Sequence, residues 1–340
     1  MIEESFKGKK KDENRIVSPQ KVTEIDHEGD LNLRPQKLCQ FIGQKSNKEK
    51  LSLVIQGAKN RGDAPDHILF SGPPGLGKTT LASIIAGELE STIKITSGPT
   101  LTKTGDIAKL LTDLQENDVL FIDEIHRLNR SVEEVLYSAM EDFKLDILIG
   151  KANTAKSMRL PLKKFTLVGA TTMSGLLSSP LRDRFGIHIR LDYYKKEALK
   201  QIILRYSDLL GIKINNDAAE KLANCGRGTP RITLRILRRV RDYAETSGND
   251  IVDVKAVEKT LEILEIDNNG LDYMDRKIMN TIIEKYNSGP VSLDTIAMSI
   301  GEESRSIYEV YEPYLLQLGF LSRTPRGRTA TDAAKRYFSK

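Results

Sequence analysis

Short apolar, largely β-branched runs alternate with helical stretches through the first half of the chain. From residue 31 to about 194 this alternation is typical of a doubly wound α/β domain. Each run is four or five residues long and nearly all apolar, as expected of a parallel strand covered on both faces. The predicted strands are residues 67–71, 93–96, 119–122, 165–169 and 187–191.

The pattern changes twice more toward the C-terminus. From residue 195 to about 265 amphipathic helices take over, which predicts a small all-α domain. Residues 266–340 then show helical spacing over three segments, followed by a short basic ribbon, LSRTPRGRTAT. Three helices and such a ribbon favour a winged helix-turn-helix. The three helical segments are residues 272–286, 293–300 and 304–318.

Composition narrows the class of protein. The 340 residues are 39% hydrophobic and 29% charged, which indicates a folded, water-soluble chain. Residues 1–30 lack apolar periodicity and are predicted to be a mobile tail without the apolar core of a signal peptide, so we expect a cytoplasmic protein. The longest uncharged run, 165–181, is interrupted by polar residues, glycine and proline, which argues against a membrane span. Two distant cysteines and four scattered histidines favour neither a disulfide framework nor a zinc site.

A glycine-rich loop follows the first predicted strand directly. The segment GPPGLGKTT, residues 72–80, stands between that strand and a helical stretch, which is the context a P-loop requires. Backbone N–H groups of such a loop converge on phosphate oxygens, and the helix N-terminus adds its positive dipole end. Lys78 is predicted to reach the β- and γ-phosphates, and the Thr79 hydroxyl to bind Mg²⁺. The predicted ATP-binding residues of the loop are Gly75, Gly77, Lys78, Thr79 and Thr80.

Polar side chains end two further strands. Asp123 and Glu124 follow the apolar run at 119–122, at the strand end where open α/β sheets bind their ligands. Asp123 is predicted to hold Mg²⁺, and Glu124 to orient or deprotonate the attacking water. Thr171 and Thr172 end the segment FTLVGATT, residues 165–172, and either hydroxyl can sense the γ-phosphate or the water. A purely structural role of these strand-end threonines is the alternative. Hydrolysis of ATP is the inference.

Arginines in two later segments are candidates for contacts with phosphate. In PLRDRFG, residues 180–186, an arginine finger supplied to another subunit is expected, with Arg182 and Arg184 equally plausible from spacing alone. Residues 227–241 contain six arginines and no acid, and most of them are interpreted as a solvated helix face. Arg231 differs, because Pro230 fixes it in the first helical turn, where it can be aimed at a phosphate.

Taken together these motifs resemble the AAA+ ATPases, and within them the RuvB family of branch migration motors. The resemblance runs over nearly the whole chain, with long motifs in the family's order. They are LRP at 33–35, FIGQ at 41–44, the P-loop, LFIDEIHRL at 120–128, EDF at 141–143, VGATT at 168–172, LRDRFG at 181–186, RGTPRI at 227–232, LRRVRD at 237–242, GLDYMDRKI at 270–278, VYEPYLLQLGFL at 310–321 and RTPRGR at 323–328.

The resemblance implies roles that the residues alone leave open. It implies an ATP-driven motor on double-stranded DNA that forms a ring, expected to be a hexamer, and works with RuvA at Holliday junctions, with RuvC as a further expected partner. It places Arg184 as the finger and the hairpin near 145–160 as the RuvA contact, although a hairpin packed on its own domain is the alternative. It adds ATP-binding residues outside the P-loop, namely Leu33, Arg34, Glu141, Asp142, Phe143, Tyr194 and Arg231.

The C-terminal ribbon is expected to bind DNA. Residues 321–340 hold six Lys or Arg and one Asp, a local excess equal to the net charge of +5 of the whole chain. Basic side chains on a Gly-Pro ribbon can follow a phosphate backbone without reading bases. Where the family commonly has an arginine after Gly-Glu-Glu, this chain has Ser304, with Arg305 next to it. The predicted DNA-binding residues are Arg305, Arg323, Arg326 and Arg328.

Other function classes fit less well. A clamp-loader-like switch ATPase that remodels protein assemblies on DNA is the alternative, but clamp loaders end in a helical collar rather than a basic wing. A GTPase is disfavoured, because the chain has no Asn-Lys-x-Asp segment to read guanine. A simple winged-helix regulator does not explain a complete ATP site.

Overall fold

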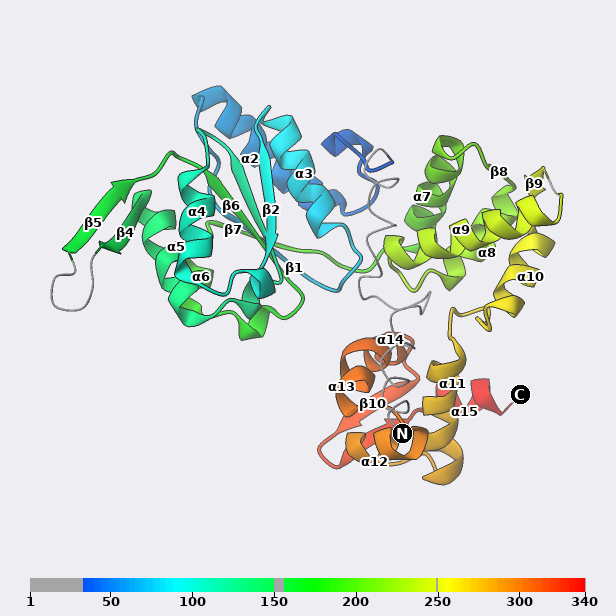
Figure 1. Cartoon of the computed structure of the whole chain (residues 1–340). Helices are drawn as coiled ribbons and strands as arrows, with labels where there is room; N and C mark the ends of the chain where they lie inside the picture. The colour runs from blue at the N-terminus through cyan, green and yellow to red at the C-terminus, as the bar shows by residue number, and fades with distance from the viewer. Residues whose placement is uncertain (1–32, 150–155, 249, 340) are drawn as a thin grey trace, which may run out of the picture. The chain divides into compact units, whose positions relative to one another are not determined.

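The computed structural model describes residues 33–149, 156–248 and 250–339 (Figure 1). They form two compact units that meet in sequence between Tyr194 and Lys195. The predicted tail, residues 1–30, lies outside the described residues.

The first unit is built on a five-stranded parallel sheet of order β2-β3-β6-β1-β7. Every strand predicted from the sequence is present, with ends shifted by at most two residues. β1, which leads into the P-loop, lies inside the sheet between β6 and β7. The strands are β1 Ile68–Ser71, β2 Ile93–Ser97, β3 Val119–Asp123, β6 Thr166–Thr171 and β7 Ile187–Arg190.

Helices cover both faces of this sheet, which explains the apolar strands. Leu120 and Ile122 of β3 belong to one core with α4, α5 and α6. Side chains of a strand alternate between faces, so Phe121 points to the opposite face, where α3 contacts β3. The helices are α2 Lys45–Arg61, α3 Lys78–Glu88, α4 Thr104–Thr112, α5 Arg130–Asp142 and α6 Ser179–Asp183, with short 3-10 turns η1 Leu38–Gln40, η2 Gly98–Thr100, η3 Ile125–Arg127 and η5 Ser174–Leu176.

A separate antiparallel hairpin projects from this unit (Figure 1). It consists of β4, Lys144–Ile149, and β5, Lys156–Pro161, with Leu145 paired to Leu160. Leu145 is buried in the core beside α5, whereas Met158 is 46% exposed. The base of the hairpin therefore packs on its own domain. Residues 150–155, between the two strands, lie outside the described part of the chain.

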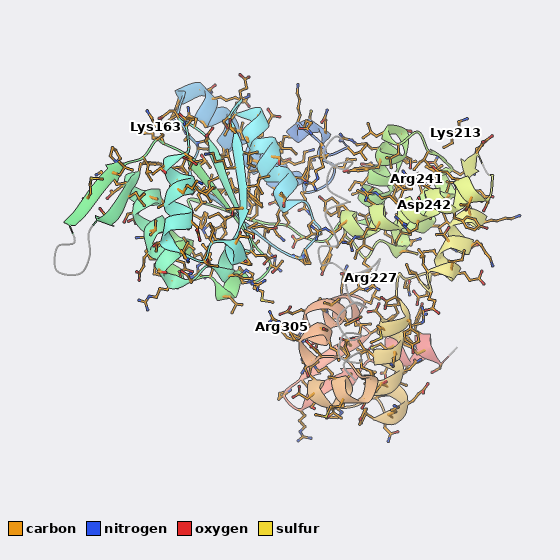
Figure 2. All side chains as sticks on the ribbon, viewed as in Figure 1. Lys163, Lys213, Arg227, Arg241, Asp242 and Arg305 are labelled. Atoms are coloured by element: carbon orange, nitrogen blue, oxygen red, sulfur yellow. The ribbon has the colours of Figure 1, made fainter. Side chains whose placement is uncertain are left out.

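The second unit begins with a bundle of four helices, the lid. They contact one another through apolar faces. The lid also contains a two-residue parallel pair, which the sequence pattern did not predict. The elements are α7 Lys196–Leu209, β8 Lys213–Ile214, α8 Asn216–Cys225, α9 Pro230–Thr246, β9 Ile251–Val252 and α10 Val254–Ile263. On α9, Arg239 is half exposed and pairs with Asp242 at 3.0 Å. Arg241 is one-third exposed and pairs with the same carboxylate at 3.3 Å (Figure 2).

The C-terminal part of this unit is a winged-helix domain with its own core. The three predicted helical segments are present, although two of them contain a π-helical turn. The antiparallel strands β10 and β11 form the wing, and a bridge from Val291 to Arg328 extends it. The elements are α11 Tyr273–Asn280, η6 Thr281–Lys285, α12 Leu293–Ile300, α13 Ser304–Ser306, η7 Ile307–Tyr311, α14 Glu312–Gln317, β10 Leu321–Thr324, β11 Gly327–Ala330 and α15 Asp332–Phe338.

In the described ranges, every helix is too short or too polar to cross a membrane.

Candidate active site and DNA-binding surface

The P-loop connects β1 to the first turn of α3, as the sequence predicts. Gly72 has φ of +134°, and a Cβ there would lie 2.4 Å from the Leu191 carbonyl oxygen, so only glycine fits between β1 and the end of β7. The Lys78 side chain is buried and donates from Nζ to the carbonyl oxygens of Gly72, at 2.7 Å, and Pro73, at 3.0 Å. The ammonium is thus held inside the loop that is expected to receive the phosphates.

Two aromatic residues support the loop from outside. The Tyr194 hydroxyl donates to the Leu76 carbonyl oxygen at 3.1 Å, and burial raises the pKa of this phenol well above its usual value. The Phe41 ring lies 3.1 Å from the position a Cβ on Gly77 would take. Both aromatic residues are more than nine-tenths buried. Tyr194 is therefore brought to the P-loop, and Phe41 of the FIGQ motif joins it.

The acidic pair lies at the end of β3, next to the end of β6. Glu124 adopts a left-handed conformation, φ +50°, which turns its side chain out of the strand direction. Its Oε2 accepts a hydrogen bond from the Thr172 hydroxyl at 3.0 Å and lies 3.3 Å from Nδ1 of His126. The sheet therefore places the predicted general base and one predicted threonine in direct contact.

The two threonines differ in their surroundings. Thr171 is fully buried, and its hydroxyl accepts from the Met173 N–H at 3.0 Å and contacts His126 Nδ1 at 2.9 Å. Thr172 is only half-buried and bonds to Glu124. His126 was not predicted as a site residue; its spacing of two from Glu124 was the available signal.

The predicted magnesium ligands fit that ion by their chemistry. Asp123 ends β3, and Thr79 lies in the first turn of α3, after β1. Mg²⁺ commonly takes one or two protein oxygens and completes its shell with phosphate oxygens and water. Within the described residues there is no cluster of three or more His, Cys, Asp or Glu that could hold a metal alone. A hydroxyl and one carboxylate therefore suit an ion that arrives with a nucleotide.

Arg184 is held close to its own domain. It follows α6, where its Nη1 donates to the Pro180 carbonyl oxygen at 2.7 Å and its Nη2 lies 3.0 Å from Glu141 Oε2. The guanidinium carbon lies 4.5 Å from the centroid of the Tyr137 ring. Arg182, the alternative finger, is more exposed and lies 3.9 Å from the Asp183 carboxylate. Glu141, predicted to bind ATP, thus contacts the predicted finger.

Other predicted ATP-binding residues lie apart from the P-loop. The Phe143 ring packs against His67 and Phe165, which precede β1 and β6, so it lies at the sheet edge opposite the P-loop. Because Asp142 directly precedes Phe143 at the end of α5, the structure does not bring either residue to the phosphates of its own subunit. Leu33 and Arg34 are half-buried at the start of the described chain, and Arg231 lies in the second unit, in the first turn of α9.

The wing presents its arginines unequally. Arg323 and Arg328 both donate through Nε to Oε1 of Glu312, at 2.6 and 3.1 Å, and this carboxylate is fully buried. Its bond to Arg323 raises the pKa of that guanidinium further. Arg326 is exposed at the turn between β10 and β11. Arg326 is thus the wing arginine best placed for a phosphate. Glu312 was not predicted, because a single Glu on a helix carries no sequence signal of burial.

The serine at the unusual position has a partner within its own domain. The Ser304 hydroxyl bonds to the Asp294 carboxylate, so it links α12 and α13. The neighbouring Arg305 is 75% exposed and pairs with Glu309 one turn on (Figure 2). Arg305 therefore remains accessible to a phosphate, which can replace a partly exposed carboxylate partner at low cost.

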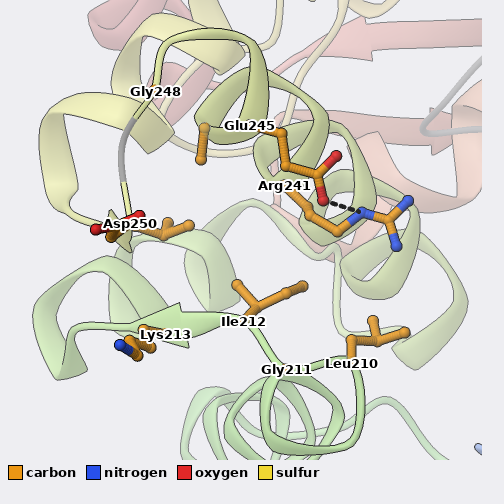
Figure 3. A pocket seen from close by; sticks show the side chains of 10 residues that line it. Leu210, Gly211, Ile212, Lys213, Arg241, Glu245, Gly248 and Asp250 are labelled. Atoms are coloured by element: carbon orange, nitrogen blue, oxygen red, sulfur yellow. Dashed lines mark ion pairs between the residues drawn. The ribbon is translucent and has the colours of Figure 1, made fainter.

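A hollow in the lid lies between the end of α9 and the β8–β9 pair (Figure 3). Its lining includes two basic residues, Lys213 and Arg241, and two acidic residues, Glu245 and Asp250. Arg241 already faces Glu245, with 3.6 Å between Nε and Oε1. The hollow thus lacks a net charge that would select an anion or a cation, and we assign it no ligand.

Comparisons with known proteins cover nearly the whole described chain. Models of the Holliday junction DNA helicase RuvB P-loop domain, the RuvB AAA lid domain and the RuvB C-terminal winged helix domain match residues 33–191, 194–267 and 268–339. The RuvB subunits of the Holliday junction branch migration complex from Clostridium kluyveri and Fusobacterium nucleatum are each 54% identical to this chain, over 96% and 91% of it and 93% of each relative. The solved Thermotoga maritima RuvB branch migration motor has 54% identity and a TM-score of 0.81, covering 90% of this chain and 98% of that one.

Proposed function

This chain belongs to the RuvB family, and from that membership we propose that it is the ATP-driven motor subunit that moves Holliday junctions together with RuvA. The observation that carries the proposal is the match of three successive RuvB domain models to one chain that also has a P-loop and an acidic strand end in contact with a second strand. The clamp-loader alternative is disfavoured, because the C-terminal domain is a winged helix.

Each residue of the nucleotide site then has a stated task. Lys78 releases the carbonyl oxygens of its own loop and binds the β- and γ-phosphates, while backbone N–H groups of the loop bind the remaining oxygens. Thr79 and Asp123 hold Mg²⁺, which neutralises charge on the phosphates when bound. Glu124 accepts the proton of the attacking water. The bond from Thr172 holds this carboxylate in place, so Thr172 rather than Thr171 is the residue that senses the γ-phosphate.

Arg184 is proposed as a finger that serves the neighbouring subunit of a hexameric ring. Its Nε is buried and has no hydrogen-bond partner among the described residues, and its two exchangeable contacts are an exposed Glu141 and the Tyr137 ring. A neighbour's γ-phosphate offers a stronger acceptor than a solvated carboxylate. Glu141 contacts Arg184, and Asp142 and Phe143 follow Glu141 directly in the sequence. We therefore assign these three residues to the subunit interface rather than to the P-loop of their own subunit.

Contacts from the remaining predicted residues complete the proposal. Leu33 and Arg34 line the adenine pocket, Tyr194 contacts the nucleotide beside the P-loop, and Arg231 contacts it from the lid. Arg326 and Arg305 bind phosphates of double-stranded DNA, the hairpin near 145–160 docks on RuvA, and RuvC binds the assembly. The proposed domains are 31–194, 195–265 and 266–340, after a tail over 1–30. Location in the cytoplasm stays a prediction.

Dissociation of a synthetic four-way junction tests the proposal. The purified chain is mixed with the labelled junction and ATP, with and without RuvA. We expect ATP-dependent dissociation that requires both proteins. A non-hydrolysable ATP analogue is the control and should support no dissociation. ATP hydrolysis without any junction movement in the presence of RuvA would instead favour a switch ATPase.

A further inference from the structure

Arg227 opens the RGTPR segment, residues 227–231, and it is not part of the solvated basic face. Its side chain is 3% exposed. Nε donates to the Gly270 carbonyl oxygen at 2.7 Å, Nη2 bonds to the Asp275 carboxylate, and the guanidinium carbon lies 4.6 Å from the centroid of the Tyr314 ring. These contacts all lie on residues that follow the lid helices, so one lid arginine is embedded in the winged-helix part of the same unit (Figure 2).

The partners of Arg227 are fixed in their own domain. Asp275 is fully buried and accepts a hydrogen bond from the Asp272 N–H at 3.0 Å, which closes the first turn of α11. The Tyr314 ring belongs to α14, and its hydroxyl donates to the Asn269 carbonyl oxygen. Arg227 therefore contacts α11, α14 and the link between the lid and the winged helix at once.

The backbone beside this contact is packed without space. Gly270 has φ of +78°, and a Cβ there would lie 2.5 Å from the Cys225 carbonyl oxygen. The Cys225 thiol faces the Asp267 carbonyl oxygen at 3.5 Å, and burial raises the pKa of this thiol to about 12. The link is thus closely packed against the end of α8. Such close-packed interfaces transmit displacements instead of absorbing them.

The turn between Arg227 and Arg231 is also tightly bonded. The Thr229 N–H donates to the Gly226 carbonyl oxygen at 2.9 Å, and the Thr233 hydroxyl donates back to the Thr229 carbonyl oxygen at 2.9 Å. Arg227 itself is held in the left-handed region, φ +52°, which its surroundings must enforce. Only three residues separate Arg231 from Arg227, so a shift of Arg231 reaches Arg227 through a short segment with little freedom to yield.

We propose that Arg227 is a positioning residue that couples the nucleotide state, felt by Arg231, to the orientation of the DNA-binding winged helix. This inference rests on the proposed function, in which Arg231 contacts nucleotide and the winged helix contacts DNA. The RGTPR segment then has two ends with different tasks. Arg231 senses the nucleotide, and Arg227 carries the resulting displacement into α11 and α14.

The test compares two arginine-to-lysine substitutions at the same junction. Arg227→Lys keeps the positive charge but loses the planar fork that bonds Gly270 and Asp275 together and stacks on Tyr314. Arg276→Lys is the matched control, because Nη1 of Arg276 donates to the Glu265 and Leu271 carbonyl oxygens, at 2.9 and 3.1 Å, which fixes the link without touching the RGTPR segment. Both full-length variants are assayed with RuvA for ATP consumed per junction dissociated.

We expect Arg227→Lys to retain its ATPase rate without DNA and its duplex affinity, each within about twofold, while ATP consumed per junction rises about fivefold or more. Arg276→Lys should keep the parent ratio. A merely structural role would lower the melting temperature and both activities together, with the ratio unchanged. An unchanged ratio in folded Arg227→Lys, or an equal rise in both variants, would overturn the inference.

A second variant keeps the test decisive if Arg227→Lys does not fold. Asp275→Asn preserves the shape of the partner and keeps an oxygen that can accept from both Arg227 and the Asp272 N–H, but it removes the charge. The bond to Arg227 loses most, because it joins two ionised groups. The same rise in ATP per junction is expected, and a parent ratio would overturn the inference. The parent protein separates the two hypotheses: if it moves no junction with RuvA, the proposed function fails, whereas coupling can fail only in a protein that does.

Discussion

In the proposed site Lys78 and Glu124 act on the same triphosphate in different ways, so we predict that their substitution separates binding from hydrolysis. Lys78→Ala removes the cation of the loop and should lower ATP hydrolysis by about 10²–10³-fold, together with ATP affinity. Glu124→Gln keeps an oxygen that can accept the Thr172 hydrogen bond but cannot take a proton from water. It should bind ATP at the parent affinity and retain it unhydrolysed. Nucleotide binding and single-turnover assays check both expectations, and parent turnover in Glu124→Gln would refute the role of this carboxylate.

The neighbouring threonines should fail in different ways. Thr172→Val leaves Glu124 without the hydroxyl that orients it, and a misplaced base should reduce kcat by about 100-fold with little change in ATP affinity. Thr171→Val removes a buried acceptor of the Met173 N–H, which should cost about 1–3 kcal/mol of folding free energy. Thermal unfolding and steady-state kinetics on both variants distinguish these effects. The assignment is reversed if Thr171→Val loses turnover at unchanged stability.

The sequence predicts the position of a residue best where the motif is a continuous segment with a fixed backbone conformation. It predicts poorly which side chain a residue contacts when that partner lies far away in the sequence. The P-loop and the acidic strand end follow from residues adjacent in the chain, so their positions could be read directly. Which threonine meets Glu124 depends on how β6 ends against β3, which no local pattern specifies. For the same reason the contact of Glu141 with Arg184 could not be predicted.

At the level of elements, the arginines of the wing differ because two of them bond to the buried carboxylate of Glu312, whereas Arg326 is exposed. Arg326→Ala should weaken binding to duplexes of any sequence and make the slope of log K against log salt shallower by about one unit, with an unchanged melting temperature. Arg328→Ala should lower the melting temperature as well, because Glu312 is fully buried and loses one of its two arginines. Affinities for two unrelated duplexes at several salt concentrations, with thermal unfolding, check both variants.

Two outcomes would contradict this division of the wing. A loss of affinity confined to one duplex after Arg326→Ala would indicate readout of bases rather than phosphates. An unchanged melting temperature in Arg328→Ala would show that the bonds to Glu312 do not stabilise the domain. Arg323→Lys is a useful comparison, because it keeps a charge near Glu312 but loses the stacking of the guanidinium on Tyr308 at 4.7 Å.

The inner strands β1, β3 and β6 were predicted closely because a parallel strand buried on both faces has an uninterrupted apolar run. The two edge strands, β2 and β7, are partly exposed and include polar residues. The same rule explains what was missed. The β8–β9 pair has only two residues in each strand, too few to show any periodicity. The π-helical turns within 272–286 and 304–318 leave the apolar spacing nearly unchanged, so these segments were predicted only as helices.

At the scale of the whole molecule, the family resemblance predicted which domain binds nucleotide and which binds DNA. It did not predict the contacts between the lid and the winged helix. The burial of Arg227 was not predicted, because its partners Gly270, Asp275 and Tyr314 lie more than forty residues away. Charge patterning cannot reveal that one basic side chain of six is buried. Coupling between domains therefore had to be inferred from the structure.

We predict that in a ring Arg184 of one subunit lies beside the nucleotide of the next, and this arrangement can be tested by mixing. Arg184→Ala subunits should bind ATP normally yet fail to activate their neighbours, and Lys78→Ala subunits lack a pocket but keep the finger. In a head-to-tail ring of equal amounts, about a quarter of interfaces combine an intact pocket with an intact finger. ATPase should therefore reappear on mixing two inactive proteins. If mixed rings form, as shown by co-purification of differently tagged subunits, and no activity returns, Arg184 does not act between subunits.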